Sequence, residues 1–271
     1  MDRHAPATLS STPAVWKQIR ILILLLILLI VAVRAWHDRV STTSWRDSLW
    51  VGIFPINGDD SEVAKSYVAG LAREDFADIE TFFARQAPRF GRNLDQPVRI
   101  ELYPASSTPP PALAAAAGPI GIAWWSLKLR WFAGRAADVP GRVPPQIRLF
   151  VLFHDPAQLP SLPDSHGMQK GLVGVVHVFA SRAMAGSNDV VIAHELLHTL
   201  GATDKYVLGT GEPIFPQGFA EPDAHPLYPQ TQAEIMAPRR ALSPADFEMV
   251  RNLREVVVGP LTAAEIRWTA H

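Results

Sequence analysis

The sequence has 271 residues and is 48% hydrophobic, which is enough to bury one sizeable core. Its 25 basic and 26 acidic residues give a formal net charge of −1, and this balance argues against nucleic acid as a partner. The absence of cysteine excludes disulfides, cysteine-ligated zinc and thiol catalysis, and it fits the cytoplasm and the periplasm equally well.

An apolar run near the N-terminus predicts one membrane helix. Ile21–Val33 contains only Ile, Leu, Val and Ala, but as a helix it rises only about 20 Å, short of a hydrocarbon core of about 30 Å. Trp16 and Trp36 stand where interfacial aromatic residues are found, and Arg20 and Arg34 can extend the span by snorkelling. A cleaved signal peptide with a poor cleavage site is the alternative. We expect an uncleaved signal anchor, because the run is nearly pure Leu and Ile.

This run predicts the domain organisation. We expect a cytoplasmic tail at 1–20, the transmembrane anchor at 21–36, a Ser- and Thr-rich tether at 37–47 and one folded domain at 48–271. Basic residues flank the run on both sides, so they do not set its orientation. A single N-terminal anchor before a large domain usually leaves that domain outside the cytoplasm. We therefore expect the folded domain in the periplasm or the extracellular space. Nothing in the sequence predicts an oligomeric state.

Strands and helices alternate in the first part of the folded domain. The patterns predict four strands and one long helix capped by Asp60 or Ser61, with strands at 49–56, 98–103, 146–154 and 172–180, the helix at about 62–86 and a loop at 104–119. The strand at 172–180 directly precedes the next helix, a position where we expect an edge strand that pairs with bound peptide. The alternation predicts an α+β fold with a mixed, twisted sheet.

The segment 120–133 allows two interpretations. It contains Trp124, Trp125 and Trp131, with basic side chains among them. It fits an interfacial helix that lies on the membrane, and it also fits an ordinary element packed in the fold, which is the commoner situation. Its Pro and Gly residues at the start and its charges at the end argue against a second membrane span.

The next predicted helix carries the chemistry. It spans 189–200, with Ser187 or Asn188 as its cap. His194 and His198 lie four residues apart, so they project from one face of the helix and can bind one metal ion from two successive turns.

Three more residues complete the predicted site. Glu195 points to a neighbouring side of the helix, where it can hold a water molecule on the metal. Gly201 lets the helix end and the chain turn back, and Asp204 then brings a third ligand atom. Two neutral imidazoles and one carboxylate leave a fourth position open, and this arrangement is typical of a catalytic Zn²⁺ rather than a structural one.

The extended pattern HExxHxxGxxD, which ends at Asp204, resembles the metzincin clan of zinc peptidases. Most metzincins use His as the third ligand, whereas an Asp there resembles the snapalysin-like branch. Downstream, the segment 233–237 with Met236 resembles the Met-turn, the tight turn beneath the metal. The chain departs from many metzincins two residues later, where Pro238 replaces a Tyr. The resemblance covers 194–237 and no earlier part of the chain.

The resemblance implies a zincin domain with an irregular C-terminal subdomain and a peptide or protein as substrate. Glu195 would accept a proton from the zinc-activated water as it attacks the peptide carbonyl, and would then pass that proton to the leaving amine. Tyr206 is the candidate for stabilising the oxyanion. In one alternative, a zinc hydrolase of gluzincin type takes Glu221 or Glu234 as its third ligand. In another, the domain is a catalytically silent, zinc-stabilised binding module.

Beyond this site we expect loops and helices. Residues 207–233 are rich in Gly and Pro and predict an irregular segment. Ser243 and Asp246 flank a proline in a pattern typical of a helix start, and the predicted helix runs to about Val257. A last short helix is expected from Thr262.

Overall fold

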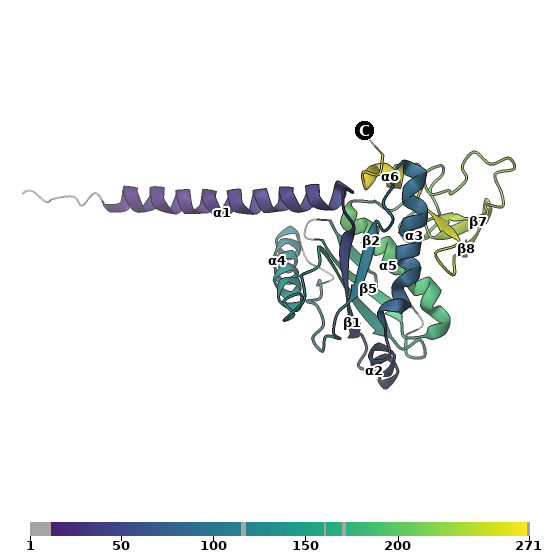
Figure 1. Ribbon diagram of the computed structural model, residues 1–271, viewed down its shortest axis with the longest axis horizontal. Helices are drawn as coiled ribbons and strands as arrows, with labels where there is room; N and C mark the ends of the chain where they lie inside the picture. Colours follow the sequence, from purple (N-terminus) through teal and green to yellow (C-terminus); the bar gives the residue numbers. More distant parts are fainter. Residues whose placement is uncertain (1–11, 115–117, 160, 170–171, 270–271) are drawn as a thin grey trace, which may run out of the picture. The chain divides into compact units, whose positions relative to one another are not determined.

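In the computed structural model, which describes residues 12–114, 118–159, 161–169 and 172–269, five strands form one mixed sheet (Figure 1). Their order across the sheet is β2 (Val98–Leu102), β1 (Leu49–Asn57), β3 (Ile147–His154), β5 (Val173–Phe179) and β4 (His166–Met168). The first four run parallel to one another, and β4 is antiparallel to β5. With six α-helices in the described part of the chain, these strands confirm the predicted α+β class and mixed sheet.

The four predicted strands are present, but the predicted edge is wrong. The strand that follows residue 172, β5, lies between β3 and β4, so β4 forms that edge of the sheet. β4 has three residues and one of them is Gly167, and a strand this short shows no alternation in the sequence. The edge on this side of the sheet therefore belongs to β4 rather than to β5.

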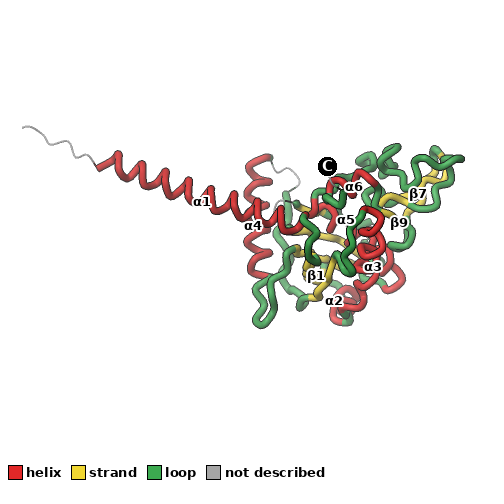
Figure 2. The backbone as a smooth tube through the Cα atoms, turned by 45° about the horizontal axis from the view of Figure 1, so that its top comes forward, coloured by secondary structure: helices red, strands yellow, loops and turns green. Residues whose placement is uncertain are grey.

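Helices cover both faces of the sheet. Figures 1 and 2 both place α4 (Pro119–Ala136) on one side of the strands, and α3 (Ala77–Gln86) and α5 (Ala185–Leu200) on the other. The side chains of β3 alternate between these two faces. Phe150 belongs to the buried apolar cluster that contains Leu129 and Ala133 of α4, and Val151 belongs to the one that contains Leu196 of α5. Because both faces are covered, the inner strands are apolar almost throughout, as parallel strands usually are.

The predicted long helix is broken. The chain forms α2 (Glu62–Ala69), a 3-10 turn and then α3, with Gly70 ending α2. Ser61 is the cap, as one of the two predicted alternatives, and its hydroxyl accepts the Ala64 N–H at 3.0 Å. The apolar periodicity continues across the break, which is why the pattern predicts one helix.

The chain divides into two units, Met1–Ser41 and Thr42–His271. The predicted apolar helix belongs to α1 (Thr12–Thr43), and its segment Trp16–Val33 is long and apolar enough to cross a membrane and is not buried. Residues 1–11 of the predicted tail lie outside the described residues.

The predicted tether is largely ordered. Residues up to Thr43 continue α1, and Thr42 and Thr43 are buried in the second unit. Trp45 is also buried, and its indole N–H donates to the Ile266 carbonyl at 2.7 Å. The last part of the predicted tether, from Thr42 to Trp45, therefore packs within the second unit. The side chains of Arg34 and Trp36, expected at the membrane interface, lie outside the described residues.

The predicted helix from Ser243 to Val257 is wrong. The chain forms the hairpin β7 (Arg239–Ser243) and β8 (Asp246–Met249). The Ser243 hydroxyl accepts the Ala245 N–H at 3.3 Å, so the residue that would cap a helix instead closes the hairpin turn.

The rest of the C-terminal part is irregular, as predicted. β6 (Ala233–Glu234) pairs in parallel with β9 (Val256–Val257). The expected last helix is present as α6 (Pro260–Glu265), which begins two residues before Thr262.

The substitution Trp45→Ala should lower the free energy of unfolding by about 3–5 kcal/mol, because it leaves a cavity beside Trp268, whose ring centroid lies 5.4 Å away. Denaturant unfolding of the full chain in detergent, followed by near-UV circular dichroism, measures the change. Arg46→Ala, at the exposed neighbouring position, is the matched control and should change the stability by less than about 0.5 kcal/mol. Equal stability of the two variants would contradict the burial of this junction.

Candidate metal centre

The start of α5 is fixed by contacts with β5. The helix begins at Ala185, and neither predicted cap acts as one: the Ser187 hydroxyl donates to the Met184 carbonyl at 2.9 Å. Asn188 instead bonds Phe179 twice, since its side-chain oxygen accepts the backbone N–H at 3.1 Å and its amide donates to the carbonyl at 2.8 Å. These two bonds hold α5 against the strand.

Two backbone carbonyls orient the imidazoles of α5. His194 Nδ1 lies 2.9 Å from the Ile235 oxygen, and His198 Nδ1 lies 2.8 Å from the Ala202 oxygen. A carbonyl oxygen only accepts hydrogen bonds, so Nδ1 of each ring must carry a proton. In the neutral rings, each Nε2 then presents a lone pair. The two Nε2 atoms lie 3.0 Å apart.

Asp204 completes a triangle with these nitrogens. Its Oδ1 atom lies 3.2 Å from Nε2 of His194 and 3.2 Å from Nε2 of His198. That oxygen is buried and has no hydrogen-bond donor with acceptable geometry. Three lone-pair atoms therefore face one another, and a cation among them removes their repulsion. A tetrahedral ion with bonds of about 2.0–2.2 Å holds its ligand atoms about 3.3–3.6 Å apart. The separations of 3.0 and 3.2 Å are only slightly shorter, so a small widening of the triangle would admit a metal ion.

Glu195 lies beside the same point. One of its carboxylate oxygens and a nitrogen of each of the two histidines lie within 4.8 Å of one another, so these three residues could together hold a metal ion. Its side chain is buried in the centre of α5. The cluster of His194, Glu195 and His198 that the sequence predicts on one helix is thus present.

A glycine turn brings Asp204 back to the helix. Gly201 has φ of 107°, in the left-handed region, and its N–H bonds the His198 carbonyl at 3.1 Å. The next N–H, of Ala202, bonds the Leu197 carbonyl at 3.0 Å. The predicted role of Gly201 at the end of the helix agrees with this geometry.

Residues on both sides of Asp204 are anchored to the C-terminal segment. The Glu265 carboxylate of α6 accepts the Thr203 N–H at 3.0 Å and forms an ion pair of 2.8 Å with the buried Lys205 ammonium. The Lys205 N–H donates to the Met236 carbonyl at 2.9 Å. The neighbours of Asp204 on both sides are therefore held in place by contacts with residues about 30–60 positions away in the chain.

Met236 lies in a tight turn. The Ala237 N–H bonds the Glu234 carbonyl at 2.9 Å, and the side chain of Met236 is fully buried. The Ile235 carbonyl in the same turn is the group that accepts from His194. The turn that resembles a Met-turn therefore contacts one of the candidate ligands, His194, directly.

Neither alternative glutamate lies in the triangle. The buried Glu234 carboxylate accepts hydrogen bonds from the backbone N–H groups of Met236 and Gly259 and from the Thr262 hydroxyl, and so it supports the turn. The Glu221 carboxylate accepts from the N–H and hydroxyl of Thr231. The carboxylate oxygen that forms the triangle with the two Nε2 atoms is that of Asp204.

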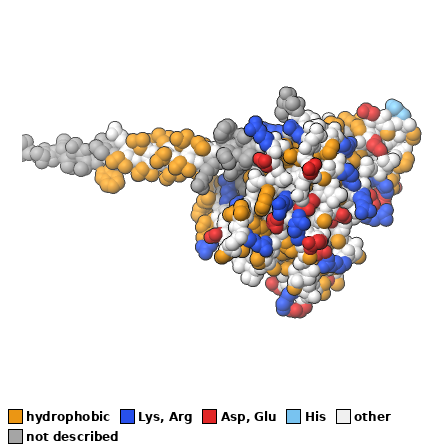
Figure 3. Space-filling view, viewed as in Figure 1, with side chains coloured by type: hydrophobic (Ala, Val, Ile, Leu, Met, Phe, Trp, Pro, Cys, Tyr) orange, Lys and Arg blue, Asp and Glu red, His pale blue; other side chains and the backbone are white. Residues whose placement is uncertain are grey.

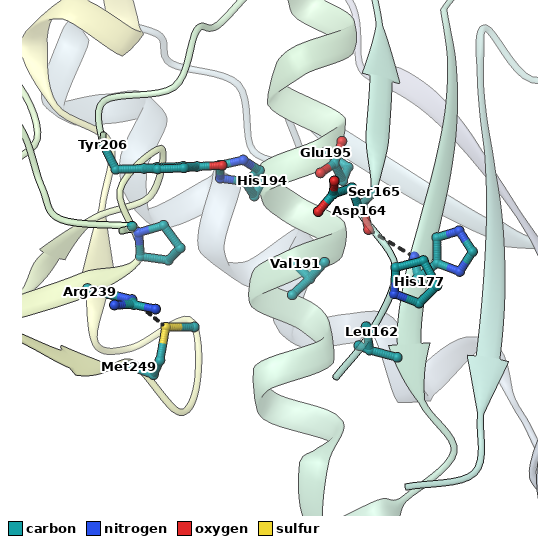
Figure 4. Close-up of a pocket in the computed structure, with 13 residues that line it drawn as sticks. Leu162, Asp164, Ser165, His177, Val191, His194, Glu195, Tyr206, Arg239 and Met249 are labelled. Atoms are coloured by element: carbon teal, nitrogen blue, oxygen red, sulfur yellow. Dashed lines mark hydrogen bonds between the residues drawn. The ribbon is translucent and has the colours of Figure 1, made fainter. Parts of the chain in front are cut away.

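Tyr206 faces the same space. Figure 4 shows its hydroxyl directed towards His194, and the two ring centroids lie 6.4 Å apart. Burial and the charges of Asp204 and Glu195 raise the pKa of Tyr206 to about 12. The phenol therefore stays protonated at neutral pH and is able to donate a hydrogen bond.

A cleft of about 310 Å³ opens beside the triangle. Figure 4 shows α5 between its two walls. The residues that line the cleft are Leu162, Pro163, Asp164, Ser165, His177, Val191, His194, Glu195, Tyr206, Gly211, Pro238, Arg239 and Met249. β4 lies close against α5, since a Cβ atom on Gly167 would lie 2.5 Å from the Glu195 carbonyl oxygen.

Sequence patterns leave several of these contributions unpredicted. Two of the groups that orient the histidines are backbone carbonyls, which no residue type marks. Glu265 lies 60 residues from its partner Lys205. His177, which no sequence motif singles out, lines the cleft, and its Nδ1 lies 2.8 Å from His154 Nε2.

The substitution Glu265→Gln should weaken metal binding by about 10-fold or more, because it removes the charge that holds Lys205 and the loop of Asp204. Competition with a chromophoric chelator on the full chain measures the affinity. Glu62→Gln, which removes an exposed ion pair with Lys65, is the control and should leave the affinity unchanged. The same affinity in both variants would show that the ion pair does not position the third ligand.

Comparison with known proteins adds no relative. No family model matches the chain, and no curated protein matches it. The conclusions about this centre therefore depend on its own geometry, on the surrounding fold and on the residue pattern.

Proposed function

We propose that this chain is a zinc-dependent peptidase of the metzincin type, held at a membrane by α1. The observation that carries the proposal is the convergence of three lone-pair atoms, from His194, His198 and Asp204, beside a buried carboxylate and an open cleft. A site that only stabilises a fold is usually closed by four protein ligands, whereas a catalytic site keeps one position open.

The donor set favours zinc over other metals. Two imidazole nitrogens and one carboxylate oxygen in a compact triangle suit a small tetrahedral ion, whereas Ca²⁺ takes six to eight oxygen ligands and Mg²⁺ prefers octahedral oxygen sites. The hydrogen bonds from Nδ1 to the Ile235 and Ala202 carbonyls resemble the outer contacts that fix the tautomer of metal-ligating histidines.

The residues around the triangle suit the hydrolysis of an amide. When bound, Zn²⁺ acts as a Lewis acid and lowers the pKa of a water molecule towards about 7. Glu195 holds the attacking water, accepts its proton and later gives that proton to the leaving amine. Tyr206, protonated at neutral pH, donates a hydrogen bond to the oxygen that becomes negative when the carbonyl is attacked.

The fold favours an extended peptide as substrate. β4 is at the edge of the five-stranded sheet, and no strand among the described residues pairs with its outer side. A peptide that adds to this edge would form backbone hydrogen bonds and run past α5, against which Gly167 lies. Such a peptide would pass the cleft with its carbonyl groups near Glu195.

We also propose that the catalytic unit lies outside the cytoplasm. The segment Trp16–Val33 could span a membrane, and a large C-terminal unit follows it. The substrate would then be a peptide or protein of the periplasm or the extracellular space.

The substitution Glu195→Gln should retain the metal and lower peptide cleavage by about 100-fold or more, because the amide no longer accepts the proton. Elemental analysis measures the zinc in the purified full chain, and mass spectrometry of a digested peptide library measures cleavage with and without a chelator. Full activity in the variant would refute the role of Glu195. If the unsubstituted chain binds zinc but shows no chelator-sensitive cleavage, the domain is a silent binding module instead.

The third ligand is tested by comparing Asp204→Ala with Glu221→Ala and Glu234→Gln. We expect only Asp204→Ala to lose zinc. Its zinc affinity should fall by more than the factor of about 10–100 that is typical when a residue that only orients a ligand is replaced. Chelator competition gives the affinities, and circular dichroism shows that each variant is folded. Loss of zinc in a folded Glu221 or Glu234 variant, with Asp204→Ala unaffected, would instead identify a gluzincin-type site.

A further inference from the structure

Helix α4 has two apolar faces, and only one of them is covered. On its inner face Leu129 and Ala133 are buried against the sheet, and the Trp125 indole donates to the Pro111 carbonyl at 2.7 Å. On its outer face the large side chains are exposed, with Ile120 86%, Trp124 59%, Leu127 57% and Trp131 66% accessible. These four follow the spacing of one helical stripe, so they form a continuous apolar surface, which we call the outer stripe. In Figure 3 orange side chains gather where α4 lies.

The charges beside the outer stripe all have one sign. α4 contains Lys128, Arg130 and Arg135 and no acidic residue. The Lys128 ammonium lies 5.6 Å from the centre of the Trp124 ring, and the Arg135 guanidinium lies 4.9 Å from that of the Trp131 ring. Indole rings with cations stacked on them are suited to the zone between hydrocarbon and phosphate, because the rings meet the acyl chains and the cations meet anionic headgroups.

The covalent chain keeps the second unit near any membrane that α1 crosses. Eight residues separate Val33, the end of the apolar segment, from Thr42, which is buried in the second unit. Even fully extended, a link of this length reaches about 30 Å. A domain confined so close to a bilayer carries an exposed helix face with tryptophan and basic side chains, and contact with the bilayer would explain why that face is left uncovered.

We propose that the outer stripe of α4 inserts into the interfacial layer of a bilayer that contains anionic lipid. The helix lies parallel to the membrane plane, with Trp124, Leu127 and Trp131 among the upper acyl carbons and the three basic side chains at the phosphates. α4 and α5 cover opposite faces of the sheet, so this contact leaves the cleft accessible (Figure 1). α4 thereby gives the second unit a fixed orientation on the membrane, which a tether by α1 alone does not provide.

The test uses a single cysteine in the full chain, which has no native cysteine. Leu127→Cys on the outer stripe and Val63→Cys on the exposed side of α2, where Val63 is 48% accessible, are spin-labelled and reconstituted in vesicles of phosphatidylcholine with phosphatidylglycerol. We expect the label at position 127 to be shielded from a water-soluble nickel chelate and accessible to dissolved oxygen, by several-fold relative to the label at position 63. Equal accessibility of the two labels to the chelate would overturn the proposal.

Two further measurements separate the possible occupants of the stripe. The double substitution Lys128→Glu and Arg135→Glu, or vesicles of phosphatidylcholine alone, should restore several-fold access of the chelate to position 127. If shielding persists in both cases and labels at position 127 broaden one another in protein-dilute vesicles, a second copy of the chain covers the stripe and the proposal is wrong. None of these readouts needs metal or turnover, so their result is independent of whether the chain is a peptidase.

Discussion

The hydrogen bonds from the two imidazoles to the Ile235 and Ala202 carbonyls are the constraint on which the site depends. They fix which nitrogen of each ring carries the proton, and so they direct both Nε2 lone pairs to one point. Without them the rings of His194 and His198 could rotate, and the spacing along the helix would not define a ligand pair. The carboxylate of Asp204 then adds a negative charge at the same point.

These carbonyls come from segments that the C-terminal part of the chain holds in place. The turn at Glu234–Ala237 is supported by a buried carboxylate that accepts hydrogen bonds from the start of α6. Glu265 in the same helix pairs with Lys205 beside the third ligand. The small strands and loops after α5 therefore act as one support for His194 and Asp204, although they contain little regular structure. Their hydrogen bonds explain how an irregular region can hold the Asp204 loop and the His194 ring in place.

Two helices, α1 and α4, carry large apolar side chains that are exposed. α1 has an apolar segment long enough to span a bilayer, and α4 presents aromatic and basic side chains on the face that the fold leaves uncovered. Burying that stripe against lipid removes apolar surface from water without closing the cleft, since α4 and α5 lie on opposite faces of the sheet. In this orientation, the peptidase that we propose would meet substrates that lie near or emerge from the membrane.

Local patterns in the sequence determined the elements whose signal is contained in a few neighbouring residues. The apolar run of α1, the positions of four strands, the spacing of His194, Glu195 and His198, and the turn at Gly201 all follow from period, propensity and backbone freedom. The tertiary structure alone decided which strand lies at the edge, that the residues around Ser243 form a hairpin, and which carbonyls and carboxylates surround the histidines. Those choices depend on hydrogen bonds and packing between distant residues, such as Lys205 with Glu265, and no local pattern records them.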